Sequence, residues 1–391
     1  MRPFSRASLA AVTAATMAVA TFPQVMFGVL AADLIADFGV ERWQVGALVT
    51  ATALTGGVLS PTFGRVTDRV GAVHSTVGVL MAGTVSLTLV SLAPTYVMLF
   101  LVALLTAVPQ GWANPATNAL IVDNLESGAR GVVTGIKQSG VQMGAFIGGL
   151  LLPTVATIWG WRAAIAAFLV VPFGALLAMW RRPEGAHHAT AQSGGSDRVP
   201  RVVRYIAVYG GLAGLATSAT FTFLPLFAEE DQGWTASQAG LLIAGVGLIG
   251  VVARITWGSV SERLFGHGNS LRLIGLMTTV SALLLTLASR ETIRSWALIP
   301  AAILFGAGII AWNAVGMLAV MDYSPSGLVG RGTGRVQLGF LLGLGTGAPL
   351  MGLSVDRLGV YWPGWLFVTA LSIGCAFLGG RISRVSTLQH S

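Results

Sequence analysis

The segment Gly64-Arg-Val-Thr-Asp-Arg-Val-Gly71 separates two apolar runs, 44–63 and 73–93. Each run is long enough to cross the hydrocarbon core of a bilayer, which takes about 20 helical residues. Short charged segments between such runs are typical of surface loops in membrane proteins. A similar segment, Gly258-Ser-Val-Ser-Glu-Arg263, follows the apolar run 236–257 in the second half of the chain. The pattern indicates a helical membrane protein whose two halves repeat each other.

Apolar runs extend along the whole chain of 391 residues, of which 54% are hydrophobic and only 10% are charged. A soluble domain usually carries about 25% charged residues, so most of this surface is expected to face lipid. The runs are 7–32, 44–63, 73–93, 96–120, 131–157, 162–180, 204–228, 236–257, 271–289, 295–320, 331–354 and 361–380. They predict an all-α membrane protein with twelve transmembrane helices.

The longest polar interruption, 181–203, divides the predicted helices into two sets of six. Its proline, serine and glycine content is typical of a flexible linker. We therefore expect an N-terminal six-helix bundle over 1–180, a cytoplasmic linker, and a C-terminal six-helix bundle over 204–391.

The distribution of the 23 basic residues predicts the orientation, because cytoplasmic loops carry an excess of arginine and lysine. With the N-terminus inside, the outer segments hold only Arg42, Arg162, Arg290, Arg294 and Arg357. Both termini are therefore expected in the cytoplasm.

Further features recur in the same order in the two halves. Trp112 and Asn114 match Trp312 and Asn313, Asp123 matches Asp322, and Arg130 matches Arg331. Parallel repeats of six helices imply two pseudo-symmetric bundles related by an axis along the membrane normal, with a solute site between them.

In these features the chain resembles the major facilitator superfamily of transporters, in its bacterial twelve-helix form, over essentially its whole length. The segment 64–71 resembles the family's loop signature G-x-x-x-D-R-x-G, although Ala72 and Val73 stand where basic residues are usual. In the family this loop latches the cytoplasmic side in the outward-open state. The resemblance implies a gating role for Gly64, Asp68, Arg69, Gly71, Asp123, Arg130, Glu262, Arg263, Asp322 and Arg331. The alternative is that these are ordinary residues of solvated loops.

Glycines recur through the predicted fifth helix. The series Gly131, Gly140, Gly144, Gly148 and Gly149 resembles the antiporter motif of drug-exporting members, which have proline where Ala145 stands. Gly140, Gly144 and Gly148 are spaced one helical turn apart, so that a partner helix can approach closely. Two interpretations stay open, which are proton-coupled export and tight helix packing alone.

Lys137 is the only lysine in the chain and lies about 10 Å along the helix axis from Arg130. An ammonium at that depth is costly and normally faces a water-filled cavity or a partner. It is expected to bind an anionic group of the solute, to pair with a carboxylate, or to snorkel to the inner surface. The first reading leads, because no acidic residue lies obviously deep in any predicted helix. Gln138, the next residue, is expected to form a hydrogen bond with the solute.

Other polar and aromatic side chains inside the predicted helices are candidates to line the same solute site. They are Gln24, Trp112, Asn114, Asn118, Trp312 and Asn313. Amides within a membrane must be satisfied either by neighbouring helices or by the solute, and both readings stay open. Asp33, near the outer end of the first predicted helix, is the candidate for proton coupling, and a simple charge close to a loop is the alternative.

The sequence contains no phosphate loop, no metal-ligand spacing and no nucleophile elbow. We therefore expect no enzymatic activity, no cofactor and no metal. The predicted function is secondary active transport of a small organic solute by alternating access in the bacterial inner (cell) membrane, with an anionic solute as one possibility. The alternative is a proton-coupled efflux antiporter for drugs or metabolites. The expected partners are the solute, the lipid bilayer and, if transport is coupled, a proton; we expect no nucleic acid and a monomer.

Overall fold

The computed structural model describes residues 4–180, 199–290, 295–325 and 327–390, and these residues form helices with short connections. Contacts within the chain group it into two units. Unit 1 comprises Met1–Arg198 and Ser324–Leu338, and unit 2 comprises Val199–Tyr323 and Gly339–Ser391.

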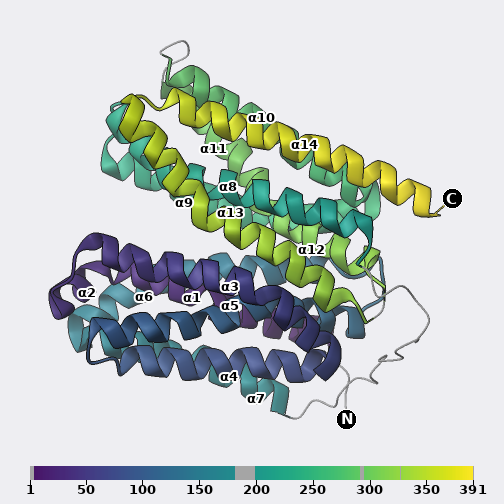
Figure 1. The fold of residues 1–391 in the computed structure, drawn as a ribbon, viewed down its shortest axis with the longest axis horizontal. Helices are drawn as coiled ribbons and strands as arrows, with labels where there is room; N and C mark the ends of the chain where they lie inside the picture. The colour runs from purple at the N-terminus through teal and green to yellow at the C-terminus, as the bar shows by residue number, and fades with distance from the viewer. Residues whose placement is uncertain (1–3, 181–198, 291–294, 326, 391) are drawn as a thin grey trace. The chain divides into compact units, whose positions relative to one another are not determined.

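Long helices run lengthwise beside one another within each unit (Figure 1). Unit 1 contains α1 (Arg6–Val29), α2 (Ala31–Phe38), α3 (Arg42–Val70), α4 (Ala72–Ser91), α5 (Tyr96–Asn124), α6 (Gly131–Phe168), α7 (Val170–Trp180) and the first turns of α13 (Val329–Leu358). Unit 2 contains α8 (Arg201–Glu230), α9 (Ala236–Val260), η1 (Ser261–Phe265), α10 (Gly266–Ala288), η2 (Ser295–Ala297), α11 (Leu298–Ala307), η3 (Ile309–Ala311), α12 (Trp312–Tyr323), the rest of α13, and α14 (Trp362–His390).

Ten helical segments of the described residues are long and apolar enough to cross a membrane. One of them, Gln238–Ala288, contains two predicted spans as α9 and α10. The predicted span 131–157 is the first part of α6, which continues through a kink at Gly160 into the next predicted span. The all-α membrane fold is therefore confirmed.

The helix boundaries depart from the predicted runs at two points. α1 ends at Val29 inside the predicted run 7–32, and α2 begins two residues later. The kink at Gly160, by contrast, falls between the predicted runs 131–157 and 162–180, and its φ of 82° is a conformation that glycine adopts without steric cost. α8 begins directly after Pro200, and therefore inside the predicted linker. Residues 181–198 of that linker lie outside the described residues, and the division into two six-helix bundles stays a prediction.

The glycine series of α6 packs against α1. A Cβ added at Gly140 would collide with the backbone of Ala14, and those added at Gly144 and Gly148 would press on other α1 residues. Small residues at such an interface let two helices approach closely. The surroundings of Gly149 lie outside the described residues. Close packing of α1 and α6 accounts for Gly140, Gly144 and Gly148 of this series.

Unit 2 uses the same device between α8 and the second part of α13. A Cβ added at Gly214 would collide with the carbonyl oxygen of Phe340, and one added at Gly343 would collide with Gly211. Close glycine contacts therefore hold helix pairs together in both units.

Candidate functional site

Lys137 lies on α6 with 0% of its surface exposed. Its Nζ donates a hydrogen bond to Oδ1 of Asn118 on α5. Among the residues that the structure describes, no carboxylate lies within ion-pairing distance of this ammonium. The side chain does not reach a surface, and it has no carboxylate partner among the described residues. Of the three interpretations of Lys137, anion binding is the one that no observation contradicts.

The polar groups around Lys137 form two hydrogen-bonded chains, Lys137–Asn118–Thr333 and Gln138–Asn114–Gln337, each of which links α6, α5 and α13. Asn118 Nδ2 donates to Thr333 Oγ1 at 3.0 Å. Gln138 Nε2 donates to Asn114 Oδ1 at 3.1 Å, and Asn114 Nδ2 donates to Gln337 Oε1 at 3.0 Å. We call this group of buried side chains in unit 1 the amide cluster, and its members are Asn114, Asn118, Lys137, Gln138, Thr333 and Gln337.

Three more buried polar atoms flank the amide cluster without a hydrogen-bond partner among the described residues. They are Gln110 Oε1, Thr134 Oγ1 and Gln142 Oε1. Gln110 lies one turn from Asn114 on α5, and the other two lie one turn either side of Gln138 on α6. Buried polar groups are normally paired with protein, water or ligand. Helices α5 and α6 therefore present a row of polar groups of which several remain available to a solute.

Thr333 and Gln337 are members of the amide cluster that the sequence analysis missed. They lie four residues apart on the first turns of α13, so that they share one face of the helix. That spacing was the available signal, but only the packing of α13 against unit 1 places the pair beside Asn114 and Asn118.

Two predicted solute-binding residues of unit 1 do not join the amide cluster. Trp112 donates from Nε1 to Thr67 Oγ1 at 3.0 Å and stacks on Phe63, so that it joins α5 to α3. Gln24 is half-buried on α1, and its side chain makes no hydrogen bond to any described residue. The packing of Trp112 explains its position without a solute.

Trp312 and Asn313, the corresponding prediction for the second half, lie in unit 2 at the start of α12. Trp312 is buried between Tyr209 and Phe340, at ring-centroid distances of 5.7 and 5.4 Å. Its Nε1 and the Asn313 Oδ1 have no hydrogen-bond partner among the described residues. These two atoms are the polar groups that unit 2 could offer to a solute at this position.

Arg254 is a second buried cation that the sequence analysis left among the surface arginines. It lies within α9, with 5% of its surface exposed, next to Gly250. Its Nε and Nη1 have no hydrogen-bond partner among the described residues. A buried cation inside a membrane protein normally faces a partner or a water-filled cavity, so Arg254 is a candidate site residue of unit 2.

Asp33, the proton-coupling candidate, lies in the first turn of α2 and is exposed. A carboxylate at this position stabilises the partial positive charge of the helix N-terminus. The structure does not bring Asp33 into the amide cluster. Its neighbour Asp37 instead forms an ion pair with Arg162 of α6, with 2.7 Å between Oδ2 and Nη1.

Arg162 also donates from Nη2 to the carbonyl of Ala93 and stacks over Trp161, whose Nε1 donates to Asp37. The hydrogen bond from Arg162, with a smaller effect from Trp161, holds the pKa of Asp37 below its usual range. Because this pKa is lower in the folded protein, the ion pair stabilises the fold fully above about pH 4, the ordinary pKa range of an aspartate. That stabilisation is lost as the pH falls through the lowered pKa of Asp37.

Replacing Asp37 by asparagine is expected to lower the Tm of the purified protein at pH 7 by no more than a few degrees. The ion pair is two-fifths exposed, and such pairs contribute at most about 1 kcal/mol. The difference in Tm from the wild type should disappear as the pH falls through the lowered pKa of Asp37, because the wild-type carboxylate then becomes protonated. A difference that persists unchanged below that pKa would show that the charge is not responsible.

The segment 64–71, between the predicted runs 44–63 and 73–93, contacts the start of α13 through Asp68. Asp68 Oδ1 accepts from the backbone N–H of Gly330 at 2.7 Å, and Oδ2 accepts from that of Arg331 at 3.0 Å. The Arg331 Nε lies 3.6 Å from the same carboxylate. Asp68 therefore caps the first turn of α13, where free N–H groups and the helix dipole both favour an anion. Gly64 lies directly against Gly330, and a Cβ there would collide with its carbonyl group.

The partners of Asp68 are thus Gly330 and Arg331, and not Arg130, another residue for which the resemblance implied a gating role. The Nε of Arg130 donates to the carbonyl of Leu125 at 2.9 Å, beyond the end of α5. The other predicted gating residues of this half, Arg69 and Asp123, are exposed, and Gly71 joins α3 to α4 with a φ of 88°.

The repeated segment of the second half has a different structure. Glu262 and Arg263 lie in η1, a single turn of π-helix. The Oδ2 of Asp322, at the end of α12, lies 2.9 Å from the Nε2 of His267, a buried residue of α10. The repeated segments of the two halves therefore differ in local structure, since one ends α3 and the other forms η1.

The model of a protein family described as the Major Facilitator Superfamily matches residues 12–289 and 206–387 of the chain. The chain belongs to this superfamily. It is a multi-pass membrane protein, and the resemblance that the loop signature suggested is confirmed.

Curated members of the superfamily are similar to parts or most of the chain. The multidrug resistance protein 1 of Bacillus subtilis (strain 168) is 27% identical over 249 residues, which cover 62% of this chain and 64% of that protein. The gallate transporter of Pseudomonas putida is 26% identical over 51% of this chain and 44% of its own length. The chain therefore spans about half the length of these two relatives. The monocarboxylate transporter 13 of Rattus norvegicus is 25% identical over 93% of this chain and 84% of its own length.

Solved structures of superfamily members show the same fold. The transporter FucP in its outward conformation has a TM-score of 0.78 at 15% identity, and covers 96% of this chain and 98% of its own. The proton:xylose symporter XylE has a TM-score of 0.79 at 12% identity, and covers 95% and 94%. At these identities the likeness concerns the fold alone.

Proposed function

We propose that the chain is a secondary active carrier of a small organic anion, in which Lys137 provides the positive charge that binds the anion. The observation that supports this most is the buried ammonium of Lys137, which has an amide partner and no described carboxylate partner. A charge inside a membrane protein is costly unless an opposite charge accompanies it. A carboxylate of the solute would supply that charge, and the neighbouring amides would orient it.

The names of several relatives favour a carboxylate. Besides the gallate transporter, they include the 4-hydroxybenzoate transporter of Pseudomonas aeruginosa, 27% identical over 46% of this chain, and the gentisate transporter of Corynebacterium glutamicum, 24% identical over 82% of it. All three named solutes are aromatic carboxylates. For this chain we therefore propose aromatic monocarboxylates as the first solute class, with Arg254 as a second cationic residue of the transport path.

The proposal includes the mode of transport. The contact of Asp68 with the start of α13 is proposed to hold one alternating-access state and to open in the other. The chain would act as a monomer in the bacterial inner membrane, with both termini in the cytoplasm. A coupling proton is part of the proposal, and Asp33 is the acid whose replacement tests it.

A second candidate function is proton-coupled efflux of drugs or metabolites. It is favoured by the similarity to the multidrug resistance protein of Bacillus subtilis and by the glycine series of α6. Because these glycines contact α1, close packing explains them whatever the direction of transport. We therefore place the carrier of organic anions first.

The test is uptake of radiolabelled 4-hydroxybenzoate into proteoliposomes that contain the purified chain. We expect saturable uptake that other aromatic carboxylates inhibit at least tenfold better than 4-hydroxybenzamide, because a hydrogen bond to a charged group contributes about 1.5–3 kcal/mol. The amide has the same ring and lacks the charge, so it is the matched control. Exchange of cationic drugs against protons, with no uptake of any carboxylate tested, would contradict the proposal and support efflux.

A further inference from the structure

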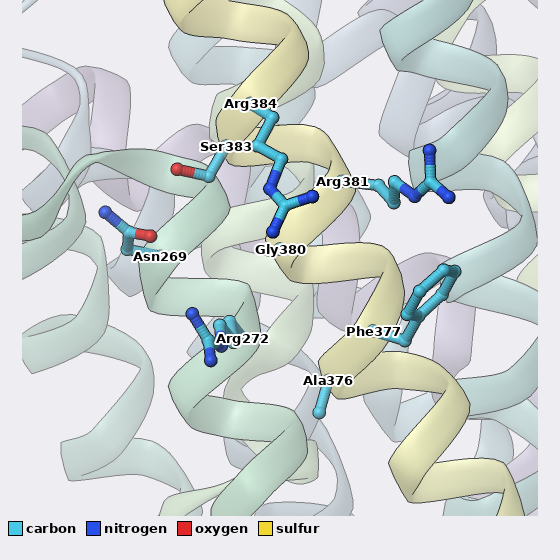
Figure 2. A pocket seen from close by; sticks show the side chains of 8 residues that line it. All are labelled: Asn269, Arg272, Ala376, Phe377, Gly380, Arg381, Ser383 and Arg384. Carbon is cyan, nitrogen blue, oxygen red and sulfur yellow. The ribbon is translucent and has the colours of Figure 1, made fainter.

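A hollow of about 230 Å³ lies between α10 and α14 of unit 2, and its lining includes neither Arg254 nor any member of the amide cluster. Its lining residues are Asn269, Arg272, Ala376, Phe377, Gly380, Arg381, Ser383 and Arg384. Figure 2 shows the Arg384 side chain over the gap between the two helices, with Arg272 on the α10 side and Arg381 beside Phe377. Three guanidinium groups from two helices therefore border one small space.

Within the part of the chain that the structure describes, no acidic side chain pairs with the arginines of this hollow. Neither the α10 sequence nor the α14 sequence contains an aspartate or a glutamate. Among the described residues, Arg272, Arg381 and Arg384 have no carboxylate within ion-pairing distance. Arginines at a surface without acidic neighbours attract anions, and their planar groups fit phosphate oxygens in pairs.

The shape of the hollow is fixed by close contacts between its two helices. A Cβ added at Gly268 would collide with Ser383, and one added at Gly379 would collide with Arg272. Gly380 leaves space instead, since a Cβ there would meet only the Arg272 Cδ, at 3.8 Å. The helices are therefore held together on both sides of a position where a missing side chain keeps the hollow open.

The hollow lies at one end of an exposed apolar surface. Four residues farther along α10 from Arg272 come the exposed Leu276 and, after another turn, Val280. On α14 the exposed Phe377 lies four residues before Arg381, and the exposed Ile373 lies four residues before Phe377. Residues one turn apart share a helix face. On each helix, an arginine thus lies at the end of an apolar run, and exposed apolar side chains follow toward the middle of that run.

We propose that this hollow binds the phosphate of an anionic phospholipid from the leaflet at the predicted cytoplasmic side. Arg272 and Arg384 contact the phosphate, Asn269 donates a hydrogen bond to the headgroup, and the acyl chains lie along the exposed residues of α10 and α14. A free phosphate has the same charge chemistry but gains nothing from the apolar surface, so the lipid is the expected source. Basic pockets between transmembrane helices on that side of a membrane are suited to anionic headgroups.

The test is native mass spectrometry of the full chain released from detergent with equal amounts of phosphatidylglycerol and phosphatidylcholine. We expect one phosphatidylglycerol to be retained, and the double variant Arg272→Gln/Arg384→Gln to reduce that retention about thirtyfold, since each arginine near an anionic surface contributes about 1 kcal/mol. The matched control is Arg201→Gln/Arg204→Gln, which removes the same charge from exposed positions of α8 at the same predicted side. This control should retain the lipid as the wild type does.

A third arm uses inorganic phosphate in place of lipid and reads the Tm of the wild type. Phosphatidylglycerol should raise the Tm, and millimolar phosphate should not. Equal retention of both lipids, equal losses in the two double variants, or a phosphate effect as large as that of the lipid would each overturn the proposal. All four arginines are exposed, so both variants are expected to fold, and an unchanged Tm in phosphatidylcholine checks this.

Discussion

Replacing Lys137 by methionine is expected to reduce transport of an organic anion at least about thirtyfold while leaving the fold intact. Methionine has a similar length and no charge, so the solute carboxylate would enter a buried site without a counter-ion. Truncating one partner of a buried, hydrogen-bonded charge pair costs about 2–5 kcal/mol. The measurement is the initial rate of uptake of the transported carboxylate into proteoliposomes, together with its binding affinity from thermal shift.

The stability of the same variant separates a binding role from a structural one. Replacing a buried charge by an apolar residue of similar volume is often neutral or stabilising. We therefore expect the Tm of Lys137→Met to equal or exceed that of the wild type. Met143→Ala, an exposed residue of the same helix, is the control and should transport normally. Transport that survives in Lys137→Met would remove the anion site from this position.

Replacing Asp68 by asparagine is expected to release the start of α13 and to lower the transport rate about tenfold. Asparagine has one acceptor oxygen, so it can cap only one of the two N–H groups that the carboxylate holds, and it loses the ion pair with Arg331. A charge at a helix N-terminus contributes about 0.3–2 kcal/mol, enough to change the ratio of two states severalfold to tenfold or more.

The release is measured by maleimide labelling of Thr333→Cys, a fully buried position one turn beyond the capped residues. The natural Cys375 is buried in unit 2 and is replaced by alanine to keep the background low. Labelling should be faster with Asp68→Asn than without it. The control is Arg65→Gln, which removes an exposed charge from the same helix end. Equal labelling in the two variants would show that Asp68 does not hold α13.

The helices of this chain could be predicted because each apolar run has the length that a bilayer requires. The break at Leu30 could not, since it lies among apolar residues with no charge or proline next to it, whereas the kink at Gly160 falls between two predicted runs. Where the helices end in solvent, capping residues such as Thr95 and Thr235 agree with the boundaries. Local sequence thus determines where a span is possible, and tertiary packing determines where it bends.

The amide cluster was predictable to the extent that its members lie on neighbouring helices at turn spacing. Lys137, Gln138, Asn114 and Asn118 satisfy that condition, and the structure brings them together. Thr333 and Gln337 belong to a helix some two hundred residues later in the sequence, and no local pattern identifies that contact. Arg254 was missed for the opposite reason, because an arginine near the end of an apolar run is usually a surface residue.

The burial of Lys137 also makes the chain unusually simple to probe with amine chemistry. Since the sequence has one lysine and its side chain is fully enclosed, the α-amino group at the N-terminus is the other amine that an acylating reagent can modify. The degree of acetylation at Lys137 then reports how often water and small molecules reach the site. A transported solute should protect this amine, and its protection constant would give the affinity without any radiolabel.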